Sequence, residues 1–412
     1  MSANDPTCTP TALVLSGGGV RGAYEVGVIR GIVEVLGPNR RCDPFQVFAG
    51  TSVGAINTTF VAAHAHTPDL GSRRLIELWT SLEIDTYLRV LAGDLLSAKP
   101  LRTRLRRLIR GPEPRPVHLG RSLLDPRPLE QLVSSGLPWD QLHRNLAQGR
   151  IRALIVSALR VATGTTTVFA ELAPNFELLP TQDPQRIDRR EPITDAHVLA
   201  SAAIPFLFPA RRVGDYYYAD GGLRFNTPVT PAVRAGARRV VVVGVHQPPK
   251  AAEQRPPLTD EELEAYPDPF FLAGKVLNAL LLDPVVNDLK FVDAQNQVLQ
   301  VLEEELSPGD YGRVIARLEA VRRQPHRKLE TLVFLPSQDI GRLAAEHASR
   351  LGGITRLHRW ILGLNPILAA AHGEADWASY LLFDGEFAGR LIDLGRHDAL
   401  ARAAEIKAFF GE

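Results

Sequence analysis

The stretch "ALVLSGGGVRGAYEVGV", residues 12–28, runs from an apolar segment through a cluster of glycines into a helix-like pattern. Its first four residues are typical of a short buried strand, and apolar residues at 26, 29, 33 and 36 predict a helix over 22–36. Glycines at 17, 19 and 22 fit G-x-G-x-x-G, the spacing of a dinucleotide-binding turn. The same backbone amides could instead bind an anion that exists only during a reaction.

Composition limits the classes of protein that this chain can be. With 412 residues, 45% hydrophobic and 23% charged, it can bury a large core, and its net charge of +1 predicts no overall attraction to nucleic acid. Its two cysteines, Cys8 and Cys42, are too few for a disulfide framework and lack the partners of a zinc site. We see neither a signal-peptide pattern nor an apolar run of about 18–20 residues, so we expect a cytoplasmic protein.

The alternation of strands and helices continues along the chain. Residues 44–63, "PFQVFAGTSVGAINTTFVAA", repeat the order of strand, glycine-bounded turn and helix. "IRALIVSALRV" and "GTTTVFAEL" predict two strands joined near Thr163 and Gly164, and "ARRVVVVGVH" predicts a buried strand after a helix-like segment. This order favours an α/β fold with a mainly parallel sheet that is covered on both faces.

A polar, proline-rich connection at 247–269 divides the chain. We expect a catalytic domain over 10–246 and a mostly helical C-terminal region over 270–412, with one strand-like run in "LETLVFLP". That region is either an extension of the same domain or a helical cap.

The cofactor interpretation of the first loop fails at the second strand. A dinucleotide fold needs an acidic residue at the end of that strand, about 20 positions after the glycines. The strand "PFQVFAG" ends instead in Thr51 and Ser52, and Asp43 lies before it, at the wrong end of the sheet. We therefore predict no dinucleotide cofactor.

Residues 50–54, "GTSVG", match G-x-S-x-G between a strand and a helix. In that setting the motif predicts a nucleophile elbow, in which Gly50 and Gly54 permit a strained turn that exposes Ser52. The alternative is a glycine-rich turn with an incidental serine.

The two glycine turns should be neighbours at one edge of a parallel sheet. The amides of Gly17, Gly18 and Gly19 could then converge on an acyl oxyanion, since no side chain blocks their approach. Arg21 either braces this loop, attracts an anionic head group or is an ordinary surface arginine.

A serine nucleophile needs a proton acceptor. No histidine after Ser52 stands in a setting that singles it out; the candidates are His197, His246, His326, His347, His358, His372 and His397. Asp220 follows an aromatic strand-like run and begins a tight turn with Gly221 and Gly222, where a carboxylate could accept the serine proton. By itself D-G is a common turn dipeptide, and it recurs at Asp384.

Four motifs in order resemble those of the patatin-like phospholipases: "SGGGVRG" at 16–22, "GTSVG" at 50–54, "ASAAIPFLFP" at 200–209 and "DGG" at 220–222. The resemblance covers about residues 12–245. The first motif of that family often begins with Asp, where this chain has Ser16.

This resemblance implies a three-layer α/β/α fold and lipid acyl hydrolase activity without a metal or other cofactor. It also implies Ser52 as nucleophile, Asp220 as base and an oxyanion hole in the glycine loop. Two other hypotheses stay open: a Ser-His-Asp esterase of small soluble esters, and a non-catalytic acyl-lipid-binding or scaffold protein.

Two segments suggest how a lipid substrate is reached. Residues 98–121 are rich in arginine, with leucines on one helical face, which fits either a peripheral helix on an anionic membrane or an ordinary surface helix. They lack the interleaved aromatics of a nucleic-acid site. Residues 270–289 are apolar enough to line an acyl channel or form a lid, and equally suit the core. Oligomeric state is left open.

Overall fold

The computed structural model of the chain describes residues 8–38, 40, 42–89, 118–119, 122–247, 292–322, 326–351 and 376–412. The predicted arginine-rich helix lies outside the described residues except for His118 and Leu119. The apolar segment 270–289 and nearly all of the proline-rich connection lie outside them as well. The division of the chain into 10–246, 247–269 and 270–412 stays a prediction.

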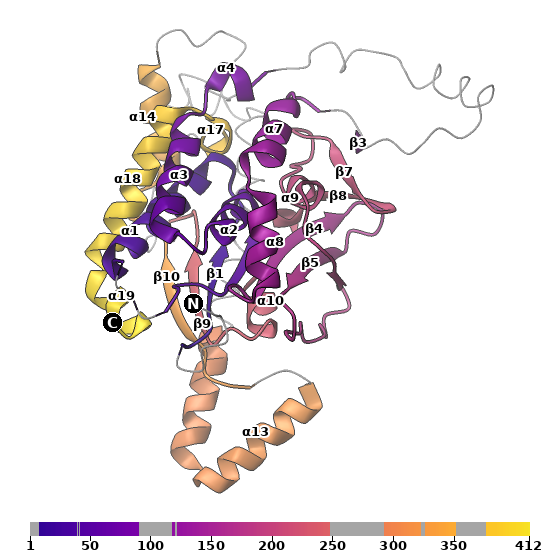
Figure 1. Cartoon of the computed structure of the whole chain (residues 1–412), viewed down its shortest axis with the longest axis vertical. Helices are drawn as coiled ribbons and strands as arrows, with labels where there is room; N and C mark the ends of the chain where they lie inside the picture. Colours follow the sequence, from indigo (N-terminus) through magenta and orange to yellow (C-terminus); the bar gives the residue numbers. More distant parts are fainter. Residues whose placement is uncertain are drawn as a thin grey trace, which may run out of the picture.

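A central sheet has five parallel strands in the order β10-β9-β1-β2-β4 (Figure 1). They are β1 (Thr11–Leu15), β2 (Val47–Thr51), β4 (Ala153–Arg160), β9 (Arg239–Val243) and β10 (Glu330–Phe334). In this register Leu15 lies opposite both Gly50 and Val243. The carboxyl ends of β1 and β2, where the two glycine turns begin, are therefore adjacent.

Antiparallel pairs extend the sheet beyond β4. They connect β4 to β8 (Tyr216–Asp220), β8 to β7 (Ala210–Val213) and β7 to β3 (His118–Leu119). A second branch joins β4 to β5 (Thr166–Leu172), which pairs in parallel with β6 (Arg186–Arg190). The antiparallel pairing of β4 with β8 brings the end of β8 beside the carboxyl end of β4, so Asp220 reaches the edge that carries the glycine turns.

Helices cover both faces of the sheet, as the continuous apolar strands predict. Leu13 and Leu15 pack in the larger core cluster, whereas Ala12 and Val14 pack in a second cluster on the opposite face. The described helices before residue 250 are α1 (Gly22–Leu36), α2 (Val53–Ala63), α3 (Pro68–Thr80), α4 (Ile84–Tyr87), α7 (Arg127–Gly136), α8 (Trp139–Ala147), α9 (Asp195–Ser201) and α10 (Val229–Arg234), with 3-10 turns η1 (Gly19–Arg21) and η2 (Gly221–Leu223).

The described C-terminal part is mostly helical and contributes β10 to the sheet. Its helices are α13 (Pro308–Arg322), α14 (Ile340–Arg350), α17 (Asp376–Leu381), α18 (Gly385–Ala401) and α19 (Ala403–Phe410). Residues 292–305 form a further helix, which with α13 projects from one end of the molecule (Figure 1). The predicted three-layer α/β fold, with its mainly parallel sheet and mostly helical C-terminal region, is confirmed.

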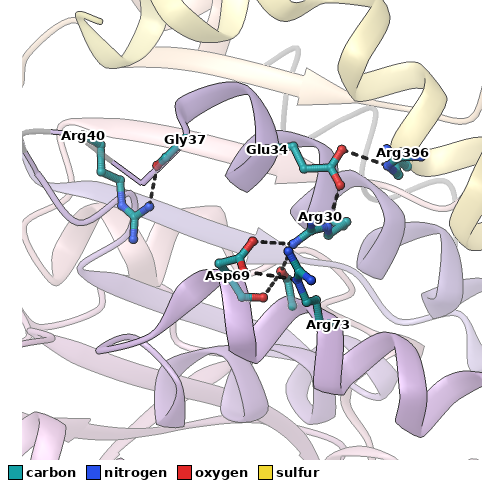
Figure 2. A network of polar contacts seen from close by, with 8 residues as sticks. Arg30, Glu34, Gly37, Arg40, Asp69, Arg73 and Arg396 are labelled. Carbon is teal, nitrogen blue, oxygen red and sulfur yellow. Dashed lines mark hydrogen bonds and ion pairs between the residues drawn. The ribbon is translucent and has the colours of Figure 1, made fainter.

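Helix α18 packs along α1 at close range. A Cβ at Gly27 would overlap the Ile392 carbonyl oxygen, and one at Gly395 would overlap that of Tyr24. One ion pair bridges the two helices at the surface: Glu34 of α1 binds Arg396 of α18 at 2.9 Å, and Arg30 of α1 binds the same carboxylate at 2.7 Å (Figure 2). Helix α18 is thereby tied to the helix that follows the glycine loop.

The N-terminal segment is held by a disulfide between Cys8 and Cys42, which the sequence analysis did not predict. Disulfides form and persist mainly in oxidising compartments. This bond weighs against the predicted cytoplasmic location, which stays a prediction. Within the described ranges, no helix is long and apolar enough to cross a bilayer.

Candidate active site

Ser52 lies at a sharp turn between β2 and α2. Its φ of 56° and ψ of −126° place a non-glycine residue in a region that most side chains avoid. A Cβ at Gly50 would overlap the Gly54 carbonyl oxygen, and one at Gly54 would lie 2.5 Å from that of Leu15. Both positions therefore require glycine, and the predicted strand–turn–helix setting of the motif is present.

Asp220 faces this turn from the end of β8. Ser52 Oγ donates a hydrogen bond to Asp220 Oδ2 at 2.6 Å, and the Gly222 amide donates to Oδ1 at 2.7 Å. Ser52 is 3% exposed and Asp220 is 1% exposed. Burial raises the pKa of the Asp220 carboxyl to about 7, although both hydrogen bonds act to lower it. A carboxylate titrating near neutrality is well suited to accept a proton.

Ser201 supports the serine from a third element, the last residue of α9. Its hydroxyl accepts a hydrogen bond from the Ser52 amide at 2.8 Å and donates to the Ser157 carbonyl oxygen on β4 at 2.7 Å. A Cβ at Gly221 would overlap that same carbonyl oxygen. Ser201 lies in the predicted "ASAAIPFLFP" motif, but sequence reasoning assigned it no role.

The glycine loop lies directly against the elbow. A Cβ at Gly17 would be 3.0 Å from that of Ser52. The Gly17 amide donates to Asn226 Oδ1 at 2.8 Å, and Asn226 Nδ2 donates to the Gly17 carbonyl oxygen at 3.3 Å. Within the part of the chain described, the amides of Gly18 and Gly19 have no acceptor. Of the three amides predicted to bind an oxyanion, those of Gly18 and Gly19 are therefore available, and that of Gly17 is already bonded to Asn226.

Asn226 was missed by sequence reasoning. It stands four residues after Gly222, in "LRFNTPV", and nothing in its local pattern distinguishes it from a turn residue. Its partner Gly17 is 209 positions away in the sequence. Only the pairing of β8 with the central strands brings the two together.

Arg21 is buried, which excludes the surface-arginine alternative. Its Nε donates to Ser379 Oγ at 2.8 Å, and its guanidinium carbon lies 4.4 Å from the centre of the Tyr380 ring. Both partners belong to α17, in the C-terminal region. The side chain thus points into a contact between the glycine loop and that region.

Among the histidine candidates, His197 and His347 have partners other than Ser52. Neither Ser52 nor Asp220 has a histidine partner among the described residues. His197 Nδ1 accepts from the Thr194 amide as part of a helix cap, and His347 Nε2 pairs with Asp384 at 2.9 Å. His358 and His372 lie outside the described residues.

The second D-G dipeptide has a structural role. Asp384 Oδ1 accepts from the Phe387 amide at 2.9 Å and caps the start of α18. The same dipeptide therefore ends a strand beside Ser52 at Asp220 and begins a helix at Asp384.

An apolar cavity adjoins the helix that Ser52 precedes. Val53 and Ile56 of α2 form one wall, and Trp79, Tyr87 and Phe383 contribute aromatic surface. The cavity has a volume of about 40 Å³, opens partly to solvent and is lined almost wholly by apolar surface. Such a lining favours hydrocarbon over an unpaired polar group.

The chain belongs to the patatin-like phospholipase family, whose model matches residues 13–233. The match contains all the motifs on which the resemblance was based. It ends before the C-terminal region begins. No curated protein sequence matches the chain.

Three solved structures are similar to this chain at low sequence identity and low TM-score. VipD from Legionella pneumophila is 12% identical with a TM-score of 0.29, over 93% of this chain and 67% of that one. Human GIVD cytosolic phospholipase A2, in complex with a methyl linolenyl fluorophosphonate, is 14% identical with a TM-score of 0.35. The match covers 98% of this chain and 58% of that one. The ExoU–SpcU complex of Pseudomonas aeruginosa is 18% identical with a TM-score of 0.28. The match covers 96% of this chain and 76% of that one. This chain thus matches less than two thirds of the human enzyme.

Proposed function

We propose that this protein is a serine acyl hydrolase that releases fatty acids from phospholipids, lysophospholipids or related acyl esters. Ser52 is the nucleophile and Asp220 is the base. The observation that carries the proposal is the 2.6 Å hydrogen bond from Ser52 Oγ to the buried Asp220 carboxylate, at a strained turn between a strand and a helix. Membership of the patatin-like phospholipase family supports a lipid as substrate.

The reaction proceeds in two steps. Ser52 Oγ attacks the ester carbonyl carbon while its proton moves to Asp220, and the tetrahedral intermediate collapses as the alcohol leaves with that proton. Water then attacks the acyl-serine, again losing its proton to Asp220, and the returning proton restores Ser52 as the fatty acid departs. A base with a pKa of about 7 exchanges protons readily in both directions.

The oxyanion of each intermediate is bound by the glycine loop. Gly18 and Gly19 supply the amides, and Gly17 anchors the loop by its bond to Asn226. Losing one such donor typically costs about 3 kcal/mol of transition-state stabilisation. Position 19 needs glycine because its φ is +57°.

The apolar cavity beside α2 supports an acyl substrate. Val53, which directly follows the nucleophile in the sequence, lines this cavity, and its apolar surface is of the kind that an acyl chain would contact. Peripheral binding to an anionic membrane through 98–121 stays a prediction, as does the cytoplasmic location.

The test measures fatty-acid release from phospholipid vesicles, from lysophospholipid and from a short soluble ester. Ser52→Ala and Asp220→Asn should each lower kcat at least about a thousandfold. A fluorophosphonate should label Ser52 covalently in the wild type and leave Ser52→Ala unlabelled.

His197→Ala serves as the control, since His197 is a buried histidine on the same helix as Ser201. It should retain activity. Loss of activity in that variant, with Asp220→Asn active, would favour the Ser-His-Asp esterase. A wild type that releases nothing and resists labelling would favour a non-catalytic acyl-lipid-binding protein.

A further inference from the structure

Helix α17 lies on the glycine loop, although it follows the loop by more than 350 residues. A Cβ at Gly19 would overlap the carbonyl oxygen of Tyr380, so the two backbones are in direct contact. Arg21, two residues later, hydrogen-bonds to the Ser379 hydroxyl at 2.8 Å and stacks on the Tyr380 ring at 4.4 Å. The three side chains are almost fully buried.

We propose that Ser379 and Tyr380, here called the α17 brace, are positioning residues that hold the glycine loop in the geometry needed to bind the oxyanion. The inference rests on the proposed hydrolase function. It assigns a role in that reaction to a segment outside the residues 13–233 that match the family.

The contacts fix the loop in two different ways. The Tyr380 carbonyl limits the space on one side of Gly19, whose left-handed backbone also sets the direction of its amide. The Arg21 guanidinium is planar and rigid, so a hydrogen bond at Nε together with stacking on a ring defines its orientation. Arg21 lies one turn beyond Gly18, and the Arg21 amide donates to the Gly18 carbonyl oxygen at 3.2 Å. Fixing the position of Arg21 therefore also restrains Gly18.

The brace is itself firmly attached. The Gly385 amide, just after α17, donates to the Leu82 carbonyl oxygen at 2.8 Å, and Asp384 accepts hydrogen bonds from both His347 and the Phe387 amide. Helix α18 then packs along α1, which begins at the end of the loop. Such a support can hold amides in place where a solvent-exposed loop could not.

The experiment compares Ser379→Ala with Ser349→Ala in the full-length protein. Ser349 is a control because, within the described part of the chain, its hydroxyl bonds to the carbonyl oxygen of Glu346 on its own helix, at an exposed position. With a soluble p-nitrophenyl ester, Ser379→Ala should lower kcat about tenfold and leave KM unchanged, since an oxyanion contact acts in the transition state. Ser349→Ala should match the wild type.

A double-mutant cycle tests whether the brace acts through Arg21. In an Arg21→Ala background, Ser379→Ala should cause little further loss of kcat. Tyr380→Phe keeps the ring and should retain most activity, whereas Tyr380→Leu should lose it. Additive losses, or a rise in KM alone, would overturn the proposal.

Hydrogen exchange separates failure of this inference from failure of the proposed function. The Gly17 and Arg21 amides, which donate to Asn226 Oδ1 and to the Gly18 carbonyl oxygen, should exchange several-fold faster in Ser379→Ala than in Ser349→Ala, whether or not the ester is a substrate. If the wild type is inactive and unlabelled, the hydrolase proposal fails and the exchange rates alone decide whether α17 holds the loop. If the wild type is active and Ser379→Ala equals it in both kcat and exchange, the brace is refuted.

Discussion

The elbow around Ser52 and the glycine loop beside it are supported in different ways. The elbow is held by Asp220, Ser201 and the glycines at 50 and 54, all within the residues that match the family. The glycine loop is held on one side by Asn226 and on the other by α17, which lies outside that match.

This difference separates two parts of one site. The proposed nucleophile and base depend on a compact motif set, whereas the glycine loop contacts a segment near the C-terminus. If the loop binds the oxyanion as proposed, changes in the C-terminal region should alter transition-state binding without touching Ser52. The predictions below test the elbow first, then the loop, and then the base.

Gly54→Ala should have a larger effect than loss of either support of the glycine loop, because Gly54 lies where the elbow and that loop touch. Its Cβ would be 2.5 Å from the carbonyl oxygen of Leu15 and 2.6 Å from that of Ser16, so backbone must shift on both sides. We expect activity to fall at least about a hundredfold, since displacement of about 1 Å has that cost. Thermal unfolding should show a loss of about 1–3 kcal/mol from overpacking.

Gly389→Ala is the matched control, in the middle of α18. A Cβ there would meet only Thr80 Cγ2, at 3.9 Å, which is an ordinary contact. Since alanine is the better helix former by about 0.8–1 kcal/mol, this variant should be slightly more stable and fully active. Equal behaviour of the two variants would contradict the close packing at Gly54.

Asn226→Ala tests the other support of the loop and should have an intermediate effect. The substitution removes both hydrogen bonds to Gly17 and so frees the glycine loop on the side away from α17. If Asn226 supports the loop as strongly as Ser379 does, kcat should fall about tenfold. Kinetics with the soluble ester at saturating concentration measure this directly.

Asn296→Ala controls for the loss of a backbone-bridging asparagine. Asn296 bonds to both the amide and the carbonyl oxygen of Leu329, at 2.9 and 2.8 Å, as Asn226 does with Gly17. Both variants should lose about 1–2 kcal/mol of stability, and only Asn226→Ala should lose kcat. A loss of kcat in Asn296→Ala as well would point to a general effect on folding.

Local pattern was enough to predict the strands and helices that form the framework. The apolar run at 12–15 became β1 (Thr11–Leu15), and the helical spacing of 22–36 became α1 (Gly22–Leu36). The strands around Gly164 formed the predicted pair β4 and β5, and "LETLVFLP" became β10. Each of these depends on periodicity within about ten residues, which a sequence displays directly.

The supports of the site could not be predicted in the same way. The bond from Arg21 to Ser379 joins residues 358 positions apart, and the bond from Ser52 to Ser201 spans 149. Ser379 has no local pattern that marks it, and Ser201 lies in the "ASAAIPFLFP" motif without any local feature that assigns it a partner. The disulfide between Cys8 and Cys42 was missed for a similar reason: two cysteines carry no spacing signal.

The pH dependence of the reaction tests the proposed base directly. Burial raises the pKa of Asp220 to about 7, so the carboxyl is protonated in mild acid and cannot accept the serine proton. The value of kcat/KM should therefore rise with pH, reach half its maximum near pH 7 and change little above pH 8. A profile that is flat from pH 5 to 9 would contradict Asp220 as the base.

The raised pKa of Asp220 also predicts that folding stability falls as pH rises, whereas activity rises over the same pH range. Because the folded-state pKa of Asp220 lies above its ordinary value of 3.8, the native protein binds more protons than the unfolded chain between about pH 4 and 7. Stability should thus decrease as pH rises through this window, when burial begins to oppose a charged carboxylate. Asp220→Asn carries no such charge, so its Tm relative to the wild type should be higher at pH 8 than at pH 5. A constant difference between the two proteins would show that the Asp220 carboxyl does not titrate in that range, and the base would then have to act with an ordinary pKa.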